Sequence, residues 1–318
     1  MKHRILIAEC LFTKHEFFNE ALLKRLAEDY IVDMLTFDAC KPSFRSNYVN
    51  YITLNLNFLR FRALKYFCMH IYFGYLTRRY AYKHVVVSSF HNLLLYPVSM
   101  IMNISSGFII LHNNIDRSDF SKLHHLGLKT ALQIFKPIVL DHRFKSHRLL
   151  KGNNNIYVLP PPIRTDCKSK KENLVFCIQQ DDDKQFQHTI TRLAQASNWK
   201  FIVKTAHPIS APNVISLKYI HDFEELLSKA KVVIVSSKYN YRVSNIMLEA
   251  IAHNCVLFAL DGCFTKSLAE KFNSLVRVHE TWDSVIDLEE QILSDCCNDF
   301  ENIHGEAAFR STVQDIFK

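Results

Sequence analysis

Glycine is scarce in this chain of 318 residues, and that scarcity removes two large classes of phosphate-binding site. Only six glycines occur, whereas average usage is roughly 7%. The chain has neither the G-x-G-x-x-G pattern of dinucleotide-binding folds nor the G-x-x-x-x-G-K-S/T loop of many nucleotide hydrolases. Any phosphate site must therefore use helix N-termini together with Lys and Arg side chains.

Metal-binding and disulfide patterns are missing as well. The sixteen histidines form no H-E-x-x-H motif and no other ligand-spaced cluster, and the nine cysteines contain no C-x-x-C pair. We therefore expect a metal-independent protein that needs no cofactor. Cys177 and Cys255 lie within expected strands, as is typical of a reducing compartment. Glu9 interrupts the start before an apolar signal-peptide segment can form, so we expect a cytoplasmic protein.

Acidic residues are absent from one long stretch, 39–115, which carries eight Lys and Arg and many aromatic residues. Residues 1–160 hold 21 Lys and Arg against 10 Asp and Glu, a net charge of +11. Residues 161–318 hold 18 against 21, a net charge of −3. A basic, aromatic-rich first half favours an anionic membrane surface or a polyanion as partner. No RNA- or DNA-binding motif is present, so we expect no nucleic acid.

Short hydrophobic runs alternate with amphipathic stretches through the whole chain, which is typical of parallel α/β domains. In the first half we expect strands at 4–8, 31–37, 85–88, 108–111, 137–140 and 156–159, and helices at 14–28, 58–80, 92–103, 120–135 and 142–150. In the second half we expect strands at 174–178, 199–204, 213–217, 231–236, 255–260 and 275–279. Helices are expected there at 186–196, 245–253, 266–272, 281–294 and 305–317, with one more that Asp222 begins and Glu225 completes as a capping box.

A proline-rich segment, LPPPIR, separates the two halves. Three consecutive prolines continue neither a strand nor a helix, so they mark a domain boundary. The pattern predicts two Rossmann-like domains facing a cleft, at 1–160 and 161–318, and the last helix can pack back on the first domain.

Two stretches of the first half raise the question of membrane contact. Residues 93–111 carry no charge, but Pro97, Asn103 and Gly107 break this run into a helix, a turn and a strand, so we reject a membrane span. Residues 58–80 combine Arg and Lys with Phe, Tyr and Leu. This helix either lies in a bilayer interface or covers the first sheet with a solvated basic face.

The stretch 231–261 organises the second half. Two Val-rich runs flank an amphipathic helix there, which indicates a βαβ unit whose loop lies at the carboxyl end of the sheet, where open α/β folds bind ligands. Ser244 and Asn245 are good N-cap residues at the start of this helix. The first-turn N–H groups are therefore placed to meet an anion.

The second half resembles the nucleotide-sugar glycosyltransferases of the GT-B fold, particularly glycosyltransferase family 4. The resemblance rests on the element spacing over about 130 residues and on Glu249-Ala250, which match the second Glu-Ala of the family's E-x7-E motif. Tyr241 stands where the family has its first Glu, Arg242 and Ser244 replace family glycines, and Asn254-Cys255 replace a Gly-Pro. A related set of bacterial polysaccharide transferases opens this helix with S-N, as Ser244-Asn245 do here.

The resemblance implies roles for several residues of the donor site. Glu249 would bind the donor ribose, and the helix N-terminus at Ser244 and Asn245 would hold the donor diphosphate. Tyr241 would lie beside the transferred sugar. Basic side chains in the loop or near strand ends would add positive potential: Arg242, Lys184 and Lys204.

In the first half, the resemblance places His112 where such enzymes present a His or Asp to the sugar. Glu9 and Asp141 also come just after expected strands, so they are expected to face the same cleft. Either carboxylate is a candidate general base if transfer inverts the anomeric centre. The family resemblance favours a retaining reaction, which needs no such base.

These observations support one main hypothesis and leave two others open. The first is a glycosyltransferase that moves a sugar from a nucleotide-sugar donor to a glycan acceptor, lipid-linked, in bacterial surface polysaccharide synthesis (lipopolysaccharide, O-antigen or capsule). It would act peripherally at the inner face of the plasma membrane. The second is a non-hydrolysing sugar-nucleotide epimerase of the same fold. The third is a non-catalytic fold relative that binds an anionic polymer.

Overall fold

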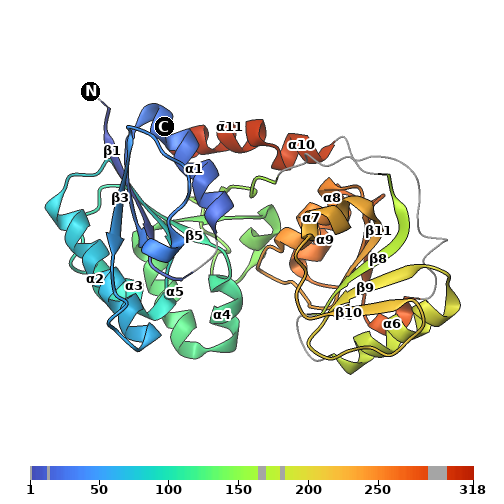
Figure 1. Cartoon of the computed structure of the whole chain (residues 1–318). Coiled ribbons are helices and arrows are strands. Elements are labelled where there is room, and N and C mark those ends of the chain that lie inside the picture. The colour runs from blue at the N-terminus through green and yellow to red at the C-terminus, as the bar shows by residue number, and fades with distance from the viewer. Residues whose placement is uncertain (1, 13–14, 164–169, 180–182, 286–298) are drawn as a thin grey trace. The chain divides into compact units, whose positions relative to one another are not determined.

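The chain forms two compact units. The computed structural model describes residues 2–12, 15–163, 170–179, 183–285 and 299–318. Unit 1 comprises Met1–Pro162 together with Glu306–Lys318, and unit 2 comprises Ile163–Gly305. The division falls two residues after the boundary expected from the proline run. Each unit has its own parallel sheet flanked by helices (Figure 1).

Unit 1 contains a seven-stranded sheet in the order β3-β2-β1-β4-β5-β6-β7, with every pair parallel. The strands are β1 (Arg4–Glu9), β2 (Ile31–Phe37), β3 (Val49–Leu54), β4 (His84–Ser89), β5 (Gly107–Leu111), β6 (Lys136–Val139) and β7 (Tyr157–Val158). The helices are α1 (Glu16–Asp29), α2 (Arg62–Arg79), α3 (Asn92–Ser99), α4 (Asn114–Phe120), α5 (Lys122–Ile134) and α11 (Glu306–Ile316), with short 3-10 turns η1 (Asp38–Cys40) and η2 (His142–Ser146). The strand order reverses direction between β1 and β4, as in doubly wound folds.

Three expectations for unit 1 need correction. Residues 49–54 form an edge strand, β3, which the sequence pattern did not reveal. The helix expected at 120–135 corresponds to α5 alone; the separate helix α4, which ends at Phe120, was not expected, and the extended backbone of Ser121 lies between the two. The helix expected at 142–150 is only the 3-10 turn η2.

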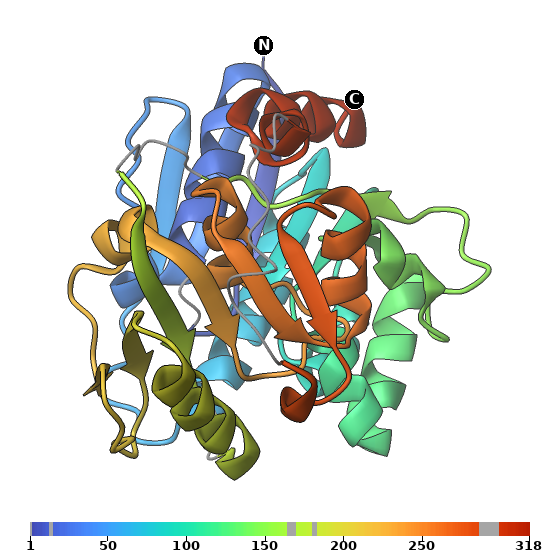
Figure 2. The same cartoon turned by 90° about the vertical axis from the view of Figure 1, so that its right-hand side faces the viewer.

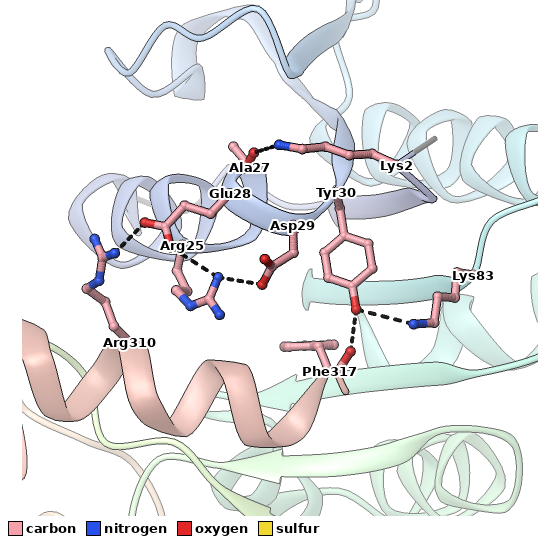
Figure 3. Close-up of polar contacts among 9 residues, drawn as sticks. All are labelled: Lys2, Arg25, Ala27, Glu28, Asp29, Tyr30, Lys83, Arg310 and Phe317. Carbon is pink, nitrogen blue, oxygen red and sulfur yellow. Dashed lines mark hydrogen bonds and ion pairs between the residues drawn. The ribbon is translucent and has the colours of Figure 1, made fainter.

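The C-terminal helix α11 packs on α1 of unit 1 (Figure 3). Phe309 lies edge-on to Phe18, with ring centroids 5.7 Å apart, and Phe317 lies against Phe108 at 4.9 Å. The Tyr30 hydroxyl donates a hydrogen bond to the backbone carbonyl of Phe317. Aromatic burial and this bond fix the last helix on the unit that contains the first strand.

Removal of the Tyr30 hydroxyl tests the polar part of this attachment. The Tyr30→Phe variant keeps the ring and loses a buried hydrogen bond to Phe317, so we expect the free energy of unfolding to fall by about 1 kcal/mol. Urea denaturation followed by circular dichroism measures the change. Tyr48→Phe, at an exposed tyrosine, is the matched control and should leave the stability unchanged. Equal stability of the Tyr30→Phe variant and the wild type would contradict the assignment.

Unit 2 contains a six-stranded parallel sheet in the order β10-β9-β8-β11-β12-β13, and its strands can be followed in Figure 2. The strands are β8 (Glu172–Ile178), β9 (Lys200–Lys204), β10 (Val214–Leu217), β11 (Ala230–Val235), β12 (Val256–Leu260) and β13 (Val276–His279). The helices are α6 (Lys184–Ala196), α7 (Phe223–Lys229), α8 (Asn245–Ala252), α9 (Cys263–Lys271) and α10 (Asp299–His304), with a 3-10 turn η3 (Trp282–Ser284). The order again reverses at the first strand, between β8 and β11.

Two details of unit 2 differ from expectation or cannot be compared. Asp222 is the N-cap residue of α7, but its side chain accepts no capping hydrogen bond. Glu225 pairs with Lys229 one turn later, so the expected capping box is not formed. The helix expected at 281–294 begins with the turn η3, and residues 286–294 lie outside the described residues.

No helix in the described part of the chain is both long and apolar enough to cross a membrane. The uncharged run 93–111 forms most of α3, a turn and β5, as expected, although Pro97 lies inside the helix and Gly107 is the first residue of the strand.

Candidate functional site

The carboxyl edge of the unit 2 sheet is where its polar loop residues gather. The backbone N–H of Ser236 bonds to Ile178, and that of Gln179 bonds to Lys204, so the residues just after β8, β9 and β11 continue the sheet side by side. This edge contains the point between β8 and β11 where the strand order reverses. Open α/β sheets bind ligands at such points.

The loop between β11 and α8 is held in place by the start of α9. The backbone N–H of Phe264 donates to the carbonyls of Tyr239 (3.2 Å) and Asn240 (3.0 Å). A Cβ atom at Gly262 would lie only 2.2 Å from the Tyr239 carbonyl oxygen, so only glycine permits this approach. The Arg242 guanidinium lies 4.6 Å from the centroid of the Tyr239 ring. Backbone contacts thus position Tyr241 and Arg242 before α8 begins.

Helix α8 begins without a side-chain cap. Ser244 is the N-cap residue, as expected, but its side chain makes no capping hydrogen bond. The first bond of the helix runs from the Leu248 N–H to the Ser244 carbonyl (3.3 Å). The N–H groups at the helix start and the positive end of the helix dipole can therefore meet an anion. Asn245, the first residue of the helix, is exposed.

Glu249 lies one turn into α8, and it is largely buried. Burial, with a smaller contribution from the Glu224 carboxylate, raises the pKa of Glu249 to about 7. In the described part of the chain, the Glu249 carboxylate has no hydrogen-bond or ion-pair partner. A carboxylate with this environment is poorly solvated, and hydroxyl donors from a ligand would stabilise its charged form.

Gln179 is a candidate site residue that the sequence did not reveal. It follows β8 at the reversal point, and only 8% of it is exposed. Its Oε1 accepts hydrogen bonds from the Thr205 hydroxyl (2.8 Å) and from Gln187 Nε2 (3.4 Å), whereas its own Nε2 has no partner among the described residues. A buried amide donor without an acceptor is uncommon in folded proteins. A polar residue directly after an apolar strand was the only available signal.

The two candidate lysines lie on the same edge but in different settings. Lys204 is the half-buried last residue of β9, two strands from β11. Lys184 is the exposed first residue of α6, where Asp183 caps the helix through the Phe186 N–H. The structure therefore brings Tyr241, Arg242, Ser244 and Asn245 together in one loop and helix start. The lysines stand on separate elements along the edge.

In unit 1, His112 and Glu9 meet the first turns of α1. The His112 ring, directly after β5, is stacked on His15 with centroids 3.8 Å apart and lies edge-on to Phe18. The Glu9 carboxylate, at the end of β1, is buried and accepts a hydrogen bond from Asn19 Nδ2 (2.8 Å).

The surroundings of His112 determine the protonation state of its imidazole. Burial, with a further contribution from His15, lowers the pKa of His112 well below its ordinary value, against a hydrogen bond with the Ser88 backbone. Its Nε2 has no partner in the described residues, so Nδ1 makes the Ser88 bond and carries the proton. His112 is thus a neutral histidine whose buried Nε2 is an acceptor without a partner among the described residues.

Asp141 lies just beyond the strand that pairs with β5 in the sheet. It follows β6, and its carboxylate accepts a hydrogen bond from the Arg143 N–H (2.9 Å) as the cap of η2. The Asp141 side chain therefore stabilises the turn that begins at His142.

No group of three or more His, Cys, Asp or Glu side chains in the described ranges could hold a metal ion. The expectation of metal independence remains a prediction.

Comparison of this chain with known proteins identifies its fold. No protein-family model matches the chain, and no curated protein matches it in sequence. Solved structures match it over nearly its whole length. Sucrose-phosphate synthase from Thermosynechococcus elongatus is 14% identical with a TM-score of 0.66, over 100% of this chain and 95% of that one. HepE from Anabaena, in complex with UDP-glucose, is 11% identical with a TM-score of 0.67, over 98% of each chain.

The chain has the GT-B fold. WaaG, a glycosyltransferase involved in lipopolysaccharide biosynthesis, gives a TM-score of 0.57 at 12% identity, over 99% of this chain and 94% of that one. Two parallel α/β units with seven and six strands agree with this assignment and with the fold class expected from the sequence. At these identities the likeness concerns architecture, and the specific family stays a prediction.

Proposed function

We propose that this GT-B protein is a glycosyltransferase that uses a nucleotide-sugar donor bound to unit 2. The uncapped start of α8 at the carboxyl edge of the sheet carries the proposal. An exposed diphosphate needs N–H donors and positive potential, and the helix start with Arg242 provides both. Structures of similar fold contain UDP-glucose or UDP, which supports a nucleotide-sugar as the ligand class.

Each part of the donor has a matching group in unit 2. The diphosphate would lie at Ser244 and Asn245, with Arg242 beside it and Lys184 and Lys204 adding positive potential. The ribose hydroxyls would donate hydrogen bonds to Glu249, whose carboxylate has no protein partner in the described residues. Tyr241 would lie next to the sugar.

Unit 1 would bind the acceptor and contribute His112. The neutral imidazole offers Nε2 as an acceptor for a sugar or acceptor hydroxyl. A retaining reaction fits this arrangement because the candidate bases, Glu9 and Asp141, are both buried and engaged in local hydrogen bonds. The acceptor we propose is a lipid-linked glycan of a bacterial surface polysaccharide, used at the inner face of the plasma membrane. The basic, acid-free stretch 39–115 supports an anionic membrane surface as partner.

Thermal-shift screening against nucleoside diphosphates and their sugars tests the donor proposal. A ligand that binds the native state at 100 times its Kd stabilises it by about 2.7 kcal/mol, so a true donor raises the unfolding temperature by several degrees. Absence of any shift across the panel would reject it. Product analysis without acceptor separates a glycosyltransferase from an epimerase, since only an epimerase converts the donor under that condition.

Loss of the Gln179 amide should weaken donor binding. The Gln179→Leu variant retains similar volume but removes the unpartnered Nε2 donor at the strand-order reversal, so we expect the Kd for a nucleoside diphosphate to rise about 10-fold. Isothermal titration calorimetry measures this change. Gln185→Leu, at an exposed glutamine on α6, is the matched control and should bind normally. An unchanged Kd for the Gln179→Leu variant would remove Gln179 from the donor site without affecting the rest of the proposal.

A further inference from the structure

Helix α2 has large apolar side chains on two opposite faces. Met69, Phe73 and Leu76 are buried against unit 1. A second set is exposed by 41–74%: Phe61, Leu64, Phe67, Ile71 and Tyr75. Successive spacings of three, three, four and four residues place this second set on one stripe of the helix. Apolar residues on both faces are expected of a helix that is covered on both sides.

Two further exposed apolar residues come directly after α3, the helix that lies beside α2 (Figure 1). A Cβ atom at Gly74 of α2 would lie 3.1 Å from the Ile101 side chain, so Ile101 packs directly on the helix. Ile101 and Met100 are themselves 43% and 69% exposed. We call the combined patch the outer α2 surface: Phe61, Leu64, Phe67, Ile71, Tyr75, Met100 and Ile101. A contiguous patch of this kind on a protein surface marks an interaction site.

The charges around the outer α2 surface have one sign. Arg60 and Arg62 are exposed at the start of the helix, and Arg78 and Arg79 are exposed at its end. Residues 39–115 contain no Asp or Glu, so no acidic side chain of this segment neutralises them. Long arginine stems lie along apolar surface while their guanidinium groups reach phosphate groups.

We propose that the outer α2 surface docks on an anionic lipid bilayer, with α2 lying in the headgroup layer and its apolar stripe turned toward the acyl chains. This inference rests on the proposed function for its biological purpose, and it adds the surface through which the protein would bind the membrane. A second copy of the chain is a poorer occupant. Two such surfaces would bring the arginines of both copies together without acidic partners from this segment, and like charges oppose association.

Vesicle sedimentation tests the proposal. We expect the wild-type chain to bind vesicles of phosphatidylcholine with phosphatidylglycerol, and to bind pure phosphatidylcholine at least about 10-fold more weakly, because anionic lipids attract the arginines. The Phe67→Ser/Ile71→Ser double variant should reduce binding to the anionic vesicles about 10-fold or more, since two inserted apolar side chains are lost. Arg78→Gln/Arg79→Gln should reduce it about 10-fold and lower its sensitivity to salt.

A matched control distinguishes binding through the outer α2 surface from nonspecific binding to vesicles. Tyr219 is 70% exposed on unit 2, so Tyr219→Ser should bind vesicles like the wild type. Thermal unfolding confirms that the variants are folded, since all substituted residues are exposed. Equal binding to both vesicle types, or no binding to either, overturns the proposal. A concentration-dependent dimer that Phe67→Ser/Ile71→Ser abolishes would show that a second copy occupies the surface.

The vesicle assay contains no nucleotide, so its outcome is independent of the donor test. A chain that binds anionic vesicles but no nucleoside diphosphate keeps the membrane surface and loses the proposed function. A chain that binds the donor but no vesicles keeps the proposed function and loses the membrane surface.

Discussion

Replacement of His112 by glutamine is expected to reduce turnover by about 10²- to 10⁴-fold, the range for a side chain that takes part directly in proton transfer or hydrogen bonding at the reacting centre. His112 is held by His15 and the Ser88 backbone with its Nε2 unpartnered, so a substrate hydroxyl is the natural partner for that nitrogen. The donor is proposed to bind unit 2, whereas His112 belongs to unit 1. The Kd for the nucleoside diphosphate should therefore be unchanged in the variant.

The pH profile gives a second readout for His112. Because its pKa is lowered below the ordinary value of 6.5, the residue stays neutral where a solvated histidine would gain a proton. We expect kcat to show no loss as the pH falls through 6.5. The variant His3→Gln, at an exposed histidine on the amino side of β1, is the control and should retain full turnover. Full activity of the His112→Gln variant would exclude a direct role.

Replacement of Glu249 by glutamine should have opposite effects on donor binding and on stability. Hydrogen bonds to a charged group contribute about 1.5–3 kcal/mol, so loss of the carboxylate should weaken nucleoside diphosphate binding by roughly 10- to 100-fold. The same change removes a buried charge that has no cation beside it in the described residues. We expect the ligand-free variant to be more stable than the wild type at pH 8, by on the order of 2 kcal/mol.

The sign of the pH dependence follows from the raised pKa. The folded state holds the Glu249 proton up to a pKa of about 7, whereas the ordinary value is 4.5. Wild-type stability relative to the glutamine variant should therefore fall as the pH rises from 4.5 to 7, and should level off above that range. Urea titrations at several pH values measure this difference.

Glu225→Gln, at an exposed glutamate on α7, is the matched control for Glu249. It should leave the nucleotide affinity unchanged. Because the Lys229 pair lowers the pKa of Glu225 below 4.5, any effect on the pH dependence of stability falls below the range in which Glu249 titrates. Wild-type affinity in the Glu249→Gln variant would remove Glu249 from the proposed donor site.

The sequence predicted the central strands of both sheets because they are short, uninterrupted apolar runs. Strands β8, β11 and β12 lie near their expected positions, and so does α8 between two of them. Strand β3 was missed because it is a half-exposed edge strand, VNYITL, in which polar and apolar residues mix. Helix α4 was missed because its seven residues, NIDRSDF, carry almost no apolar period. Short or peripheral elements depend on neighbours that a local pattern does not contain.

The candidate site also has parts that the sequence could predict and parts that it could not. The start of α8 could be located because a strand, a polar loop and an amphipathic helix follow one another in the chain. The environment of Glu249 could not, because its neighbour Glu224 belongs to α7, on the other side of β11 in the sequence. Gln179 was missed because a neutral amide leaves no charge pattern, and only the fold shows that it is buried. The position of the site in the chain could be predicted from the order of its strands and helices. The burial of its side chains could be seen only in the packed structure.

The attachment of α11 to unit 1 has a consequence for how the protein is made. Strand β1 leaves the ribosome before unit 2, and α11, the helix that packs on α1, leaves it after unit 2. Unit 1 is therefore interrupted by the entire second unit, and it cannot complete its packing around Phe309 and Phe317 until unit 2 has been synthesised. Domains generally fold as units during synthesis. In this chain unit 2, whose residues are continuous, can fold before unit 1 is whole, and a nascent unit 1 exposes the apolar surface that chaperones bind.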